Sequence, residues 1–211
     1  MVKGVIEGKR AREYELKIKD TERSKIFDNF ILKNVRKGKS IKVCDFACGP
    51  GNNIELLKNI VGEIVGVDLS PEMIRICKKK FAKNKSIKLK QASVTDTKLK
   101  SNYFDYVIIR MGLHHVKDKK KVMEEAYRIL KPKGKFLIID KYYLNLWELY
   151  RKAFYKLIFQ RNPAIFQEYM VSKKKYDAIF SSSKFKIIKK ETLPYDKKHT
   201  GQVFMYVLEK Q

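Results

Sequence analysis

The sequence predicts an α/β fold built around a mostly parallel β-sheet. Short runs rich in β-branched residues alternate with helical patterns between residues 41 and 140, and this alternation is typical of strands joined by right-handed helical crossovers. Two of the runs end in an acidic residue that a turn follows, at Asp45 and at Asp68. Open parallel sheets bind ligands at the carboxyl ends of their strands, so both acids are expected at a ligand site.

A glycine-rich turn follows the first of these acids, in the stretch Ile41-Lys-Val-Cys-Asp-Phe-Ala-Cys-Gly-Pro-Gly-Asn-Asn53. Gly49 and Gly51 allow a sharp turn, and they let a ligand approach where a Cβ atom would collide. The N–H groups that begin the next helix are free to face that ligand. The turn is therefore expected to bind a ligand.

The second acid lies in a context typical of ribose binding. Asp68 ends its strand, Ser70 suits the N-cap of the next helix, and Pro71 suits the first helical position. An acid at this place typically accepts hydrogen bonds from ribose hydroxyls. A ligand-binding loop beside such an acid indicates a nucleotide-type cofactor.

The remaining elements follow from hydrophobic period and from helix start and stop signals. We expect strands near 41–46, 63–68, 87–91, 104–110 and 135–140, and helices near 52–60, 71–83 and 119–131. The stretch Lys131-Pro-Lys-Gly134 is expected to end the last of these helices. One or two further helices are expected in residues 1–38.

Length and composition are typical of one globular domain. The chain has 211 residues, of which 44% are hydrophobic. We expect a cytoplasmic location, because neither a signal-peptide pattern nor a run of 18 apolar residues occurs. The three cysteines lack zinc-ligand spacing, so no metal site is expected, and Cys48 is interpreted as a small residue in a tight loop rather than a reactive thiol.

The net charge of +25 has two interpretations. It could serve a polyanionic partner, either nucleic acid or an anionic membrane surface. It could instead reflect lysines spread over solvated faces. We favour the second interpretation, because the small clusters at Lys78–Lys80, Lys119–Lys121 and Lys173–Lys175 fall where helix surfaces are expected.

Five ordered segments resemble the class I, Rossmann-like methyltransferases that use S-adenosylmethionine (SAM), in their small-molecule, ubiquinone–menaquinone-type branch (the type 11 methyltransferase domain). The frame Asp45-Phe-Ala47-Cys-Gly49-Pro-Gly51 fits the family's D-x-[GA]-x-G-x-G motif, and the other segments are Ile64–Ile74, Tyr103–Ile109, Leu113–Val116 and Ile129–Asp140. The resemblance implies a seven-stranded, mostly parallel sheet with helices on both faces. Phe185–Ile188 and Val203–Leu208 resemble the family's final antiparallel strand pair.

The resemblance also implies a cofactor site for SAM, with S-adenosylhomocysteine as its product. Asp45 would act through the loop and the ammonium side of SAM, Asp68 would bind the ribose, and the other implied contacts are Ala47, Gly49, Gly51, Leu69, Met73, Ser93, Val94 and Arg110. Leu69 and Met73 would pack on the adenine. Ser93 stands where many relatives carry an acid that meets the adenine amino group, and Asp96 follows three residues later.

Three residues are candidates for the reaction itself: Arg110, His115 and Tyr14. Arg110 ends the fourth strand, where it could pair with the carboxylate of SAM or of a substrate, or could extend to solvent. His115, next to His114, could act as a general base, although a histidine that braces the loop is the simpler interpretation. Tyr14 lies in an N-terminal segment, Lys9–Glu15, that resembles a family element which folds over the cofactor.

We therefore expect one methyltransferase domain over residues 1–211. It would comprise an N-terminal helical cap (1–38), a cofactor-binding core (41–140), a helical insertion after the fifth strand (142–180) and the final strand pair (184–209). The aromatic-rich insertion has three interpretations: a substrate lid, which we favour, core or dimer packing, and contact with a membrane surface. The sequence does not predict the oligomeric state.

The expected reaction is methyl transfer to a small or lipid-like acceptor, with O-, N- and C-methylation all open. Two alternatives stand beside it: an RNA- or protein-modifying methyltransferase that uses the basic surface, and a non-catalytic SAM-binding protein. Enzymes that methylate amino groups of nucleic acids usually carry [DNS]-P-P-[YFW] after the fourth strand. Here that place reads Arg110-Met-Gly-Leu113, which disfavours nucleic-acid substrates.

Overall fold

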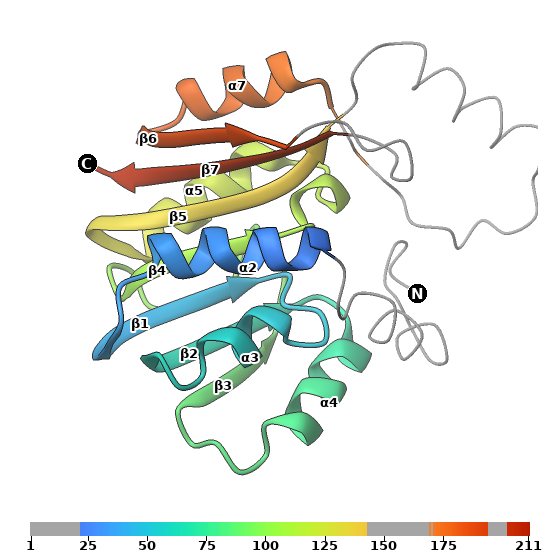
Figure 1. The fold of residues 1–211 in the computed structure, drawn as a ribbon, viewed down its shortest axis with the longest axis vertical. Coiled ribbons are helices and arrows are strands. Elements are labelled where there is room, and N and C mark those ends of the chain that lie inside the picture. Colours follow the sequence, from blue (N-terminus) through green and yellow to red (C-terminus); the bar gives the residue numbers. More distant parts are fainter. Residues whose placement is uncertain (1–21, 143–168, 170, 194–201) are drawn as a thin grey trace, which may run out of the picture.

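A computed structural model describes residues 22–142, 169, 171–193 and 202–211 (Figure 1). In chain order its elements are α2 (Glu22–Asn34), β1 (Gly38–Phe46), α3 (Asn52–Leu57), β2 (Val61–Asp68), α4 (Pro71–Lys80), β3 (Ile87–Gln91), β4 (Phe104–Arg110), the 3-10 helix η1 (Leu113–His115), α5 (Lys119–Ile129), β5 (Leu130–Tyr142), α7 (Lys173–Ser181), β6 (Phe185–Thr192) and β7 (Gln202–Lys210).

The seven strands form one sheet in the order β3-β2-β1-β4-β5-β7-β6. The strands β1 to β5 pair in parallel, and β7 runs antiparallel to both β5 and β6. The chain moves outward from β1 to β3 and then returns to place β4 on the other side of β1. This reversal creates a switch point between β1 and β4, where open α/β sheets bind ligands beyond the carboxyl ends of the strands.

Helices cover both faces of the sheet, and each face has its own hydrophobic core. Alternate strand residues point to opposite faces, as in Phe136 and Ile138 against Leu137 and Ile139 of β5. One core includes side chains from α5 and α7, and the other includes side chains from α2, α3 and α4. In Figure 1, α2 crosses in front of the strands and α5 lies behind them. Because both faces are buried, the central strands are nearly continuous apolar runs.

The sequence predicted this architecture correctly. The mostly parallel seven-stranded sheet, the helices on both faces and the antiparallel final strand are confirmed. The bounds of β3 and β4 are those expected, whereas α3 ends at Leu57 instead of residue 60 and α4 ends at Lys80 instead of residue 83. Helix α3 ends early because Val61 already begins β2. Helix α4 ends where Phe81, its C-cap, donates its N–H to the carbonyl of Cys77.

The start of β5 differs most from expectation. We expected a helix to residue 131 and a strand from 135, but α5 ends at Ile129 and Leu130 already pairs with Phe104 of β4. The register then shifts before Tyr106 pairs with Lys135. The expected stop at residues 131–134 is therefore an irregular turn inside β5, not the end of a helix.

Several expectations concern residues outside the described part of the chain. They include Tyr14, the residues before Glu22 in the helical cap, and most of the 142–180 insertion with its aromatic residues Trp147 and Tyr150. Within the described residues, no helix combines the length and apolar character that crossing a bilayer requires.

Candidate functional site

The loops that carry the sequence motifs meet at the carboxyl edge of the sheet, on the right of Figure 1. The loop after β1 and the loop after β4 are in close contact, since a Cβ atom on Gly112 would lie 2.7 Å from the Cβ atom of Ala47. Ala47 itself has a positive φ of 52°, which turns the chain sharply at the end of β1. The two loops therefore border the β1–β4 switch point, where a ligand is expected.

Gly49 has open space beside its Cα atom, unlike the other glycines of this edge. Its φ of 52° lies in the left-handed region that favours glycine, and a Cβ atom placed on it would find no described residue within 4 Å. Its N–H donates a hydrogen bond to Oδ2 of Asp68 at 2.8 Å, and its carbonyl accepts one from Sγ of Cys77 at 3.1 Å. The backbone of Gly49 is therefore fixed, while the space beside its Cα atom is open.

Gly51 has different surroundings, although it belongs to the same motif. A Cβ atom there would lie 2.6 Å from Cε2 of Phe81 and 3.0 Å from Sγ of Cys77, so the missing side chain allows α4 to pack against the loop. Gly51 is also the N-cap of α3, with a left-handed φ of 84°. Cys48 is buried, and its contact with Cys77 together with burial raises the pKa of its thiol, in line with a small structural residue.

Asp68 ends β2 and joins the two motif loops. Its Oδ2 accepts the bond from Gly49, and its Oδ1 accepts the N–H of Ser70 at 2.8 Å. Burial raises the pKa of Asp68, and these backbone hydrogen bonds oppose that rise because they favour the carboxylate. Ser70 caps α4 by accepting the N–H of Met73, with Pro71 in the first turn, as the sequence predicted.

Asp45 lies near the end of β1, almost fully buried. Its Oδ1 accepts a hydrogen bond from Nδ2 of Asn53 at 2.8 Å, while its buried Oδ2 has no hydrogen-bond partner in the described part of the chain. Burial raises the pKa of Asp45 to about 7, even though Asn53 and the nearby Arg110 favour its charged form. Asp45 can thus accept a further hydrogen bond through Oδ2, close to the glycine-rich loop after β1.

Arg110 is buried at the end of β4, so the expectation that it could extend to solvent is wrong. Its side chain is 8% exposed and forms an ion pair with Asp28 of α2 at 2.6 Å. Its other nitrogen donates to Oγ of Ser24 at 2.8 Å, and a longer contact reaches Oδ1 of Asn53 at 3.4 Å. Because the guanidinium has acidic and polar partners on α2, it fastens this helix to the switch point.

Three of the expected cofactor contacts, Leu69, Met73 and Val94, differ in exposure. Leu69 is 43% exposed beside Asp68, which leaves an apolar surface next to the expected ribose site. Met73 and Val94 are buried, and Val94 belongs to one of the two cores. Leu69 is therefore the residue of this group whose side chain is already accessible to a ligand.

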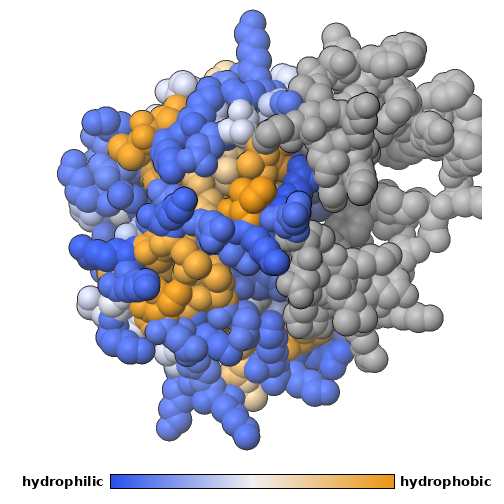
Figure 2. Space-filling view, in the orientation of Figure 1, coloured by the Kyte–Doolittle hydropathy of each residue, from blue (hydrophilic) through white to orange (hydrophobic). Residues whose placement is uncertain are grey.

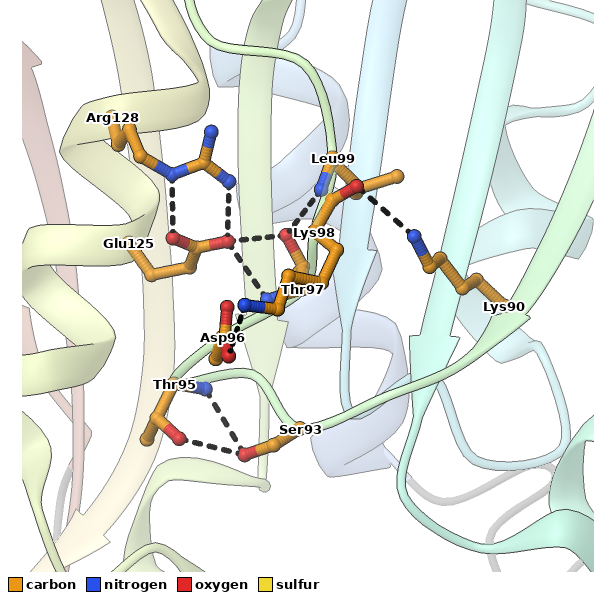
Figure 3. A network of polar contacts seen from close by, with 9 residues as sticks. All are labelled: Lys90, Ser93, Thr95, Asp96, Thr97, Lys98, Leu99, Glu125 and Arg128. Carbon is orange, nitrogen blue, oxygen red and sulfur yellow. Dashed lines mark hydrogen bonds and ion pairs between the residues drawn. The ribbon is translucent and has the colours of Figure 1, made fainter.

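Ser93 forms hydrogen bonds within its own turn, as Figure 3 shows. Its Oγ lies 2.7 Å from Oγ1 of Thr95 and accepts the N–H of Thr95 at 3.2 Å. Asp96, the acid three residues later, is largely exposed and pairs with Lys98 at 3.0 Å. The loop after β3 thus presents a hydroxyl that its own turn engages and an acid that a lysine neutralises.

A buried carboxylate holds this loop against α5 (Figure 3). Oε1 of Glu125 accepts the N–H of Thr97 at 2.8 Å and also the Thr97 hydroxyl proton, while Arg128 binds both carboxylate oxygens at 2.7 and 2.8 Å. Burial alone would raise the pKa of Glu125, but these partners outweigh it and lower the pKa. The position of the loop after β3 is therefore set by contacts with α5, a helix that lies outside the sequence motifs.

His114 and Asp140 form a buried pair that joins the loop after β4 to β5. Nδ1 of His114 lies 2.5 Å from Oδ1 of Asp140, and the His114 N–H donates to Oδ2 at 3.0 Å. Burial alone would raise the pKa of Asp140, but His114 and the N–H of Lys141 outweigh burial and lower it. His114 thus braces the loop. His115 is partly exposed, and the centroid of its ring lies 3.9 Å from the ring centroid of His114.

Lys119 is buried, so the expectation that the whole Lys119–Lys121 cluster is solvated is wrong for this residue. Its Nζ donates to the carbonyl of Val116 at 2.9 Å and to that of Tyr169 at 2.6 Å. Burial lowers the pKa of Lys119 to about 8, and the charge of Asp140 opposes that change. Because Tyr169 also donates its N–H to the carbonyl of His114, Lys119 helps to hold this residue against the histidine loop.

Sequence reasoning missed the residues that connect these loops. Asn53 bridges Asp45 and Arg110, although the sequence placed it only at the start of the helix expected near 52–60. Asp28 and Glu125 lie in amphipathic helices, where an acid usually faces solvent. Asn53 alone had a detectable signal, because an asparagine just after a glycine-rich turn is close in sequence to the site.

The raised pKa of Asp45 predicts how stability depends on pH. An aspartate in the unfolded chain titrates near pH 4, so folding takes up a proton between about pH 4 and 7 and stability falls as pH rises through that window. Replacing Asp45 with Asn removes the penalty, because a neutral amide still accepts the bond from Asn53. We expect Asp45→Asn to be more stable than the wild type by on the order of 4 kcal/mol at pH 8 and of equal stability at pH 4.

Urea unfolding at both pH values measures this difference. A variant that is less stable than the wild type at pH 8 would show that the buried carboxylate has a favourable partner.

Asp140 predicts the opposite behaviour, because its pKa is lowered. Asp140→Asn leaves buried donors of His114 and Lys141 without a charged acceptor, so we expect a loss of about 2–4 kcal/mol at pH 7. The stabilisation in the wild type is lost as pH falls below the unfolded pKa of aspartate. Asp118→Asn is the matched control, since Asp118 is an exposed N-cap where asparagine serves equally well. Equal losses in the two variants would contradict the assignment.

Comparison with known proteins adds family evidence to this geometry. A family model described as a methyltransferase domain matches residues 44–138. The demethylmenaquinone methyltransferase of Staphylococcus aureus (strain MRSA252) is 32% identical over 122 residues, which are 56% of this chain and 51% of that protein. The chain thus spans about half the length of this curated relative.

Solved structures share the fold. The PH0226 protein from Pyrococcus horikoshii has a TM-score of 0.72 and 23% identity, covering 92% of this chain and 93% of its own. A SAM-dependent methyltransferase from Methanosarcina mazei has a TM-score of 0.69 and 18% identity, covering 85% and 96%. At these identities the likeness concerns the fold alone. The solved structures therefore show the Rossmann-like fold, and the family match shows that residues 44–138 resemble a methyltransferase domain.

Proposed function

We propose that this protein transfers a methyl group from SAM to a small or lipid-like acceptor. The observation that carries the proposal is the surroundings of Gly49. Its left-handed backbone is fixed by Asp68 and Cys77, and the space beside its Cα atom is open at the carboxyl ends of β1 and β2. A fixed backbone next to open space is what a loop needs to bind a ligand closely.

The polar groups of this edge suit SAM chemically. SAM carries an ammonium group, two ribose hydroxyls and an adenine. The unpartnered Oδ2 of Asp45 offers an acceptor on the loop side, and a bound cation would favour the charged form of this carboxyl. Each carboxylate oxygen of Asp68 accepts one backbone N–H and retains a second lone pair for a ribose hydroxyl. The exposed Leu69 gives an apolar surface for the adenine.

When bound, SAM supplies a methyl group activated on a sulfonium, so the chain needs chiefly to bind and orient both reactants. We propose that the methionine part of SAM is oriented by Asp45, Ala47, Gly49 and Gly51. We also propose that the adenine packs near Met73, Ser93 and Val94. The lowered pKa of Glu125 supports a loop with a fixed position, because a charged Glu125 holds Thr97 firmly. Orientation by fixed backbone requires no metal or covalent step from this chain.

We retain His115, Arg110 and Tyr14 as candidates for the reaction site. In support, the loop that carries His115 starts directly after Arg110 at the same edge of the sheet. Arg110 binds Asp28 and Ser24, so it would bind a carboxylate of SAM or substrate only by exchanging one of them. Tyr14 and most of the 142–180 insertion, which we propose to form walls of the acceptor site, lie outside the described residues.

The acceptor class rests on the family and on the sequence. The Staphylococcus aureus relative is named for methylation of demethylmenaquinone, a lipid-like quinone, and we propose an acceptor of similar character here. The aromatic residues of the 142–180 insertion suit an apolar molecule. Figure 2 shows hydrophilic and hydrophobic residues side by side on the face in view.

Substitution of Gly49 tests the cofactor site. Gly49→Val should abolish binding of S-adenosylhomocysteine in calorimetry, because the branched side chain enters the open space. Valine also strains a left-handed backbone, whereas asparagine tolerates it, so Gly49→Asn separates steric block from strain. We expect Gly49→Asn to lower affinity at least ~10-fold, about 1.4 kcal/mol, with little change in melting temperature. Wild-type affinity in both folded variants would remove Gly49 from the site.

Transfer of labelled methyl groups tests the reaction. The protein is incubated with methyl-labelled SAM and three fractions of a cell extract: lipids, RNA and protein. We expect label in the lipid or small-molecule fraction, identified by mass, and none with Gly49→Val. Label in RNA or protein would instead support the alternative acceptors, and SAM binding without transfer to any fraction would support a non-catalytic SAM-binding protein.

A further inference from the structure

A polar hollow of about 390 Å³ lies at the amino edge of the sheet, opposite the motif loops. The hollow, here called the amino-edge hollow, is bordered by the end of α2, the start of β4 and the irregular turn of β5, on the left of Figure 1. Its wall includes Lys33, Arg36, Asp105, Tyr106, Lys131 and Lys135. The proposed methyl transfer uses none of these residues, although four of them lie in the family-like segments Tyr103–Ile109 and Ile129–Asp140.

Positive charge dominates this wall. Four of its side chains are cationic, and Asp105 is the one acid among the lining residues. Both oxygens of Asp105 are engaged, since Oδ1 pairs with Nζ of Lys131 at 2.8 Å and Oδ2 accepts the N–H of Lys42 at 2.8 Å. Asp105 therefore neutralises Lys131 and no other cation of the hollow.

The other three cations have no acidic partner in the described part of the chain. Within the described residues, no ion pair involves Lys33, Arg36 or Lys135. Three like charges at one concave surface repel each other, and the repulsion is relieved when an anion binds between them. The carboxyl end of α2 brings only about half a negative charge to the same place, which three cations exceed.

A neutral donor completes the wall. The hydroxyl of Tyr106 accepts the N–H of Arg36 at 3.1 Å, so its own proton is directed elsewhere. Among the described residues no acceptor binds that proton, and it can be donated to a ligand oxygen. Tyr106 pairs with Lys135 across β4 and β5, which places the two side chains at neighbouring positions.

We propose that the amino-edge hollow binds a compact phosphoanion with at least two negative charges, such as a diphosphate or triphosphate group. An arginine guanidinium can donate two parallel hydrogen bonds to two phosphate oxygens. Lysine ammonium groups supply positive charge, and a phenol hydroxyl can donate one further hydrogen bond. A concave site of this volume suits a small ligand, because binding pockets of about 300–1,000 Å³ hold molecules of that size. The polar wall disfavours an apolar ligand.

This site is independent of the proposed cofactor site. Both edges are reached by β4, which has Tyr106 near its amino end and Arg110 at its carboxyl end. At a rise of about 3.3 Å per residue, these ends are more than 10 Å apart. A phosphoanion in the hollow would therefore not contact the motif loops, and its binding can be measured whether or not the chain binds SAM.

Calorimetry with inorganic triphosphate and the full chain, at about 0.15 M salt where long-range effects are screened, tests the proposal. We expect saturable binding that is tighter for triphosphate than for orthophosphate. Arg36→Gln with Lys135→Gln should weaken it at least ~10-fold, since each charge-assisted hydrogen bond contributes substantially. The matched control is Lys78→Gln with Lys79→Gln, two exposed lysines of α4 with the same change in charge, which should alter affinity less than about twofold.

Three results would overturn the proposal. They are no binding of triphosphate by the wild type at millimolar concentration, an equal loss in the control variant, and binding of a single-stranded RNA oligonucleotide that triphosphate does not displace. The last result would assign the charge to nucleic acid instead. Melting curves accompany each variant, and Lys33→Gln with Lys135→Gln replaces the first pair of substitutions if that protein melts early.

Discussion

The hydrogen bond from the N–H of Gly49 to Asp68 is the contact on which the carboxyl edge depends. It joins the loop after β1 to the end of β2, and the same carboxylate then accepts the N–H of Ser70 at the start of α4. The carbonyl of Gly49 accepts a bond from Cys77 on that helix. Because one glycine and one acid connect a loop, a strand and a helix, a change at either residue alters all three.

The three buried acids of this edge differ in how far the chain satisfies them. Asp140 is met by two backbone N–H groups and His114, and its pKa is lowered. Asp68 has backbone donors alone, and burial raises its pKa. Asp45 has one amide donor and one unpartnered oxygen, and its pKa is about 7. The charge of His114 lowers the pKa of Asp140 most, whereas Asp68 has backbone donors and no such cation. Asp45, with an unpartnered oxygen among the described residues, is the acid that retains capacity for a ligand.

The sequence predicted those parts of the structure that local pattern determines. Hydrophobic runs located the strands, and the positions of Asp45, Asp68 and Ser70 followed from where those strands end. What it did not predict are contacts between distant segments, such as Arg110 with Asp28, which are 82 residues apart.

Charged residues in amphipathic helices are ordinarily assigned to the surface, since most of them are solvated. Glu125 and Lys119 depart from that rule because loops fold over them and supply their hydrogen-bond partners. Such partners depend on the topology of the whole sheet, which no local window of sequence contains.

The two edges of the sheet share elements that run between them. The side chains of Ser24 and Asp28 in α2 bind Arg110 at the carboxyl edge, and Lys33 of the same helix borders the amino-edge hollow. A helix of 13 residues is about 20 Å long and nearly rigid, so it could carry a displacement from one edge to the other. Coupling between ligands nevertheless requires an element with two alternative positions. The packing of Phe27, Phe30 and Ile31 of α2 into the core holds one position, so the two edges should bind their ligands independently.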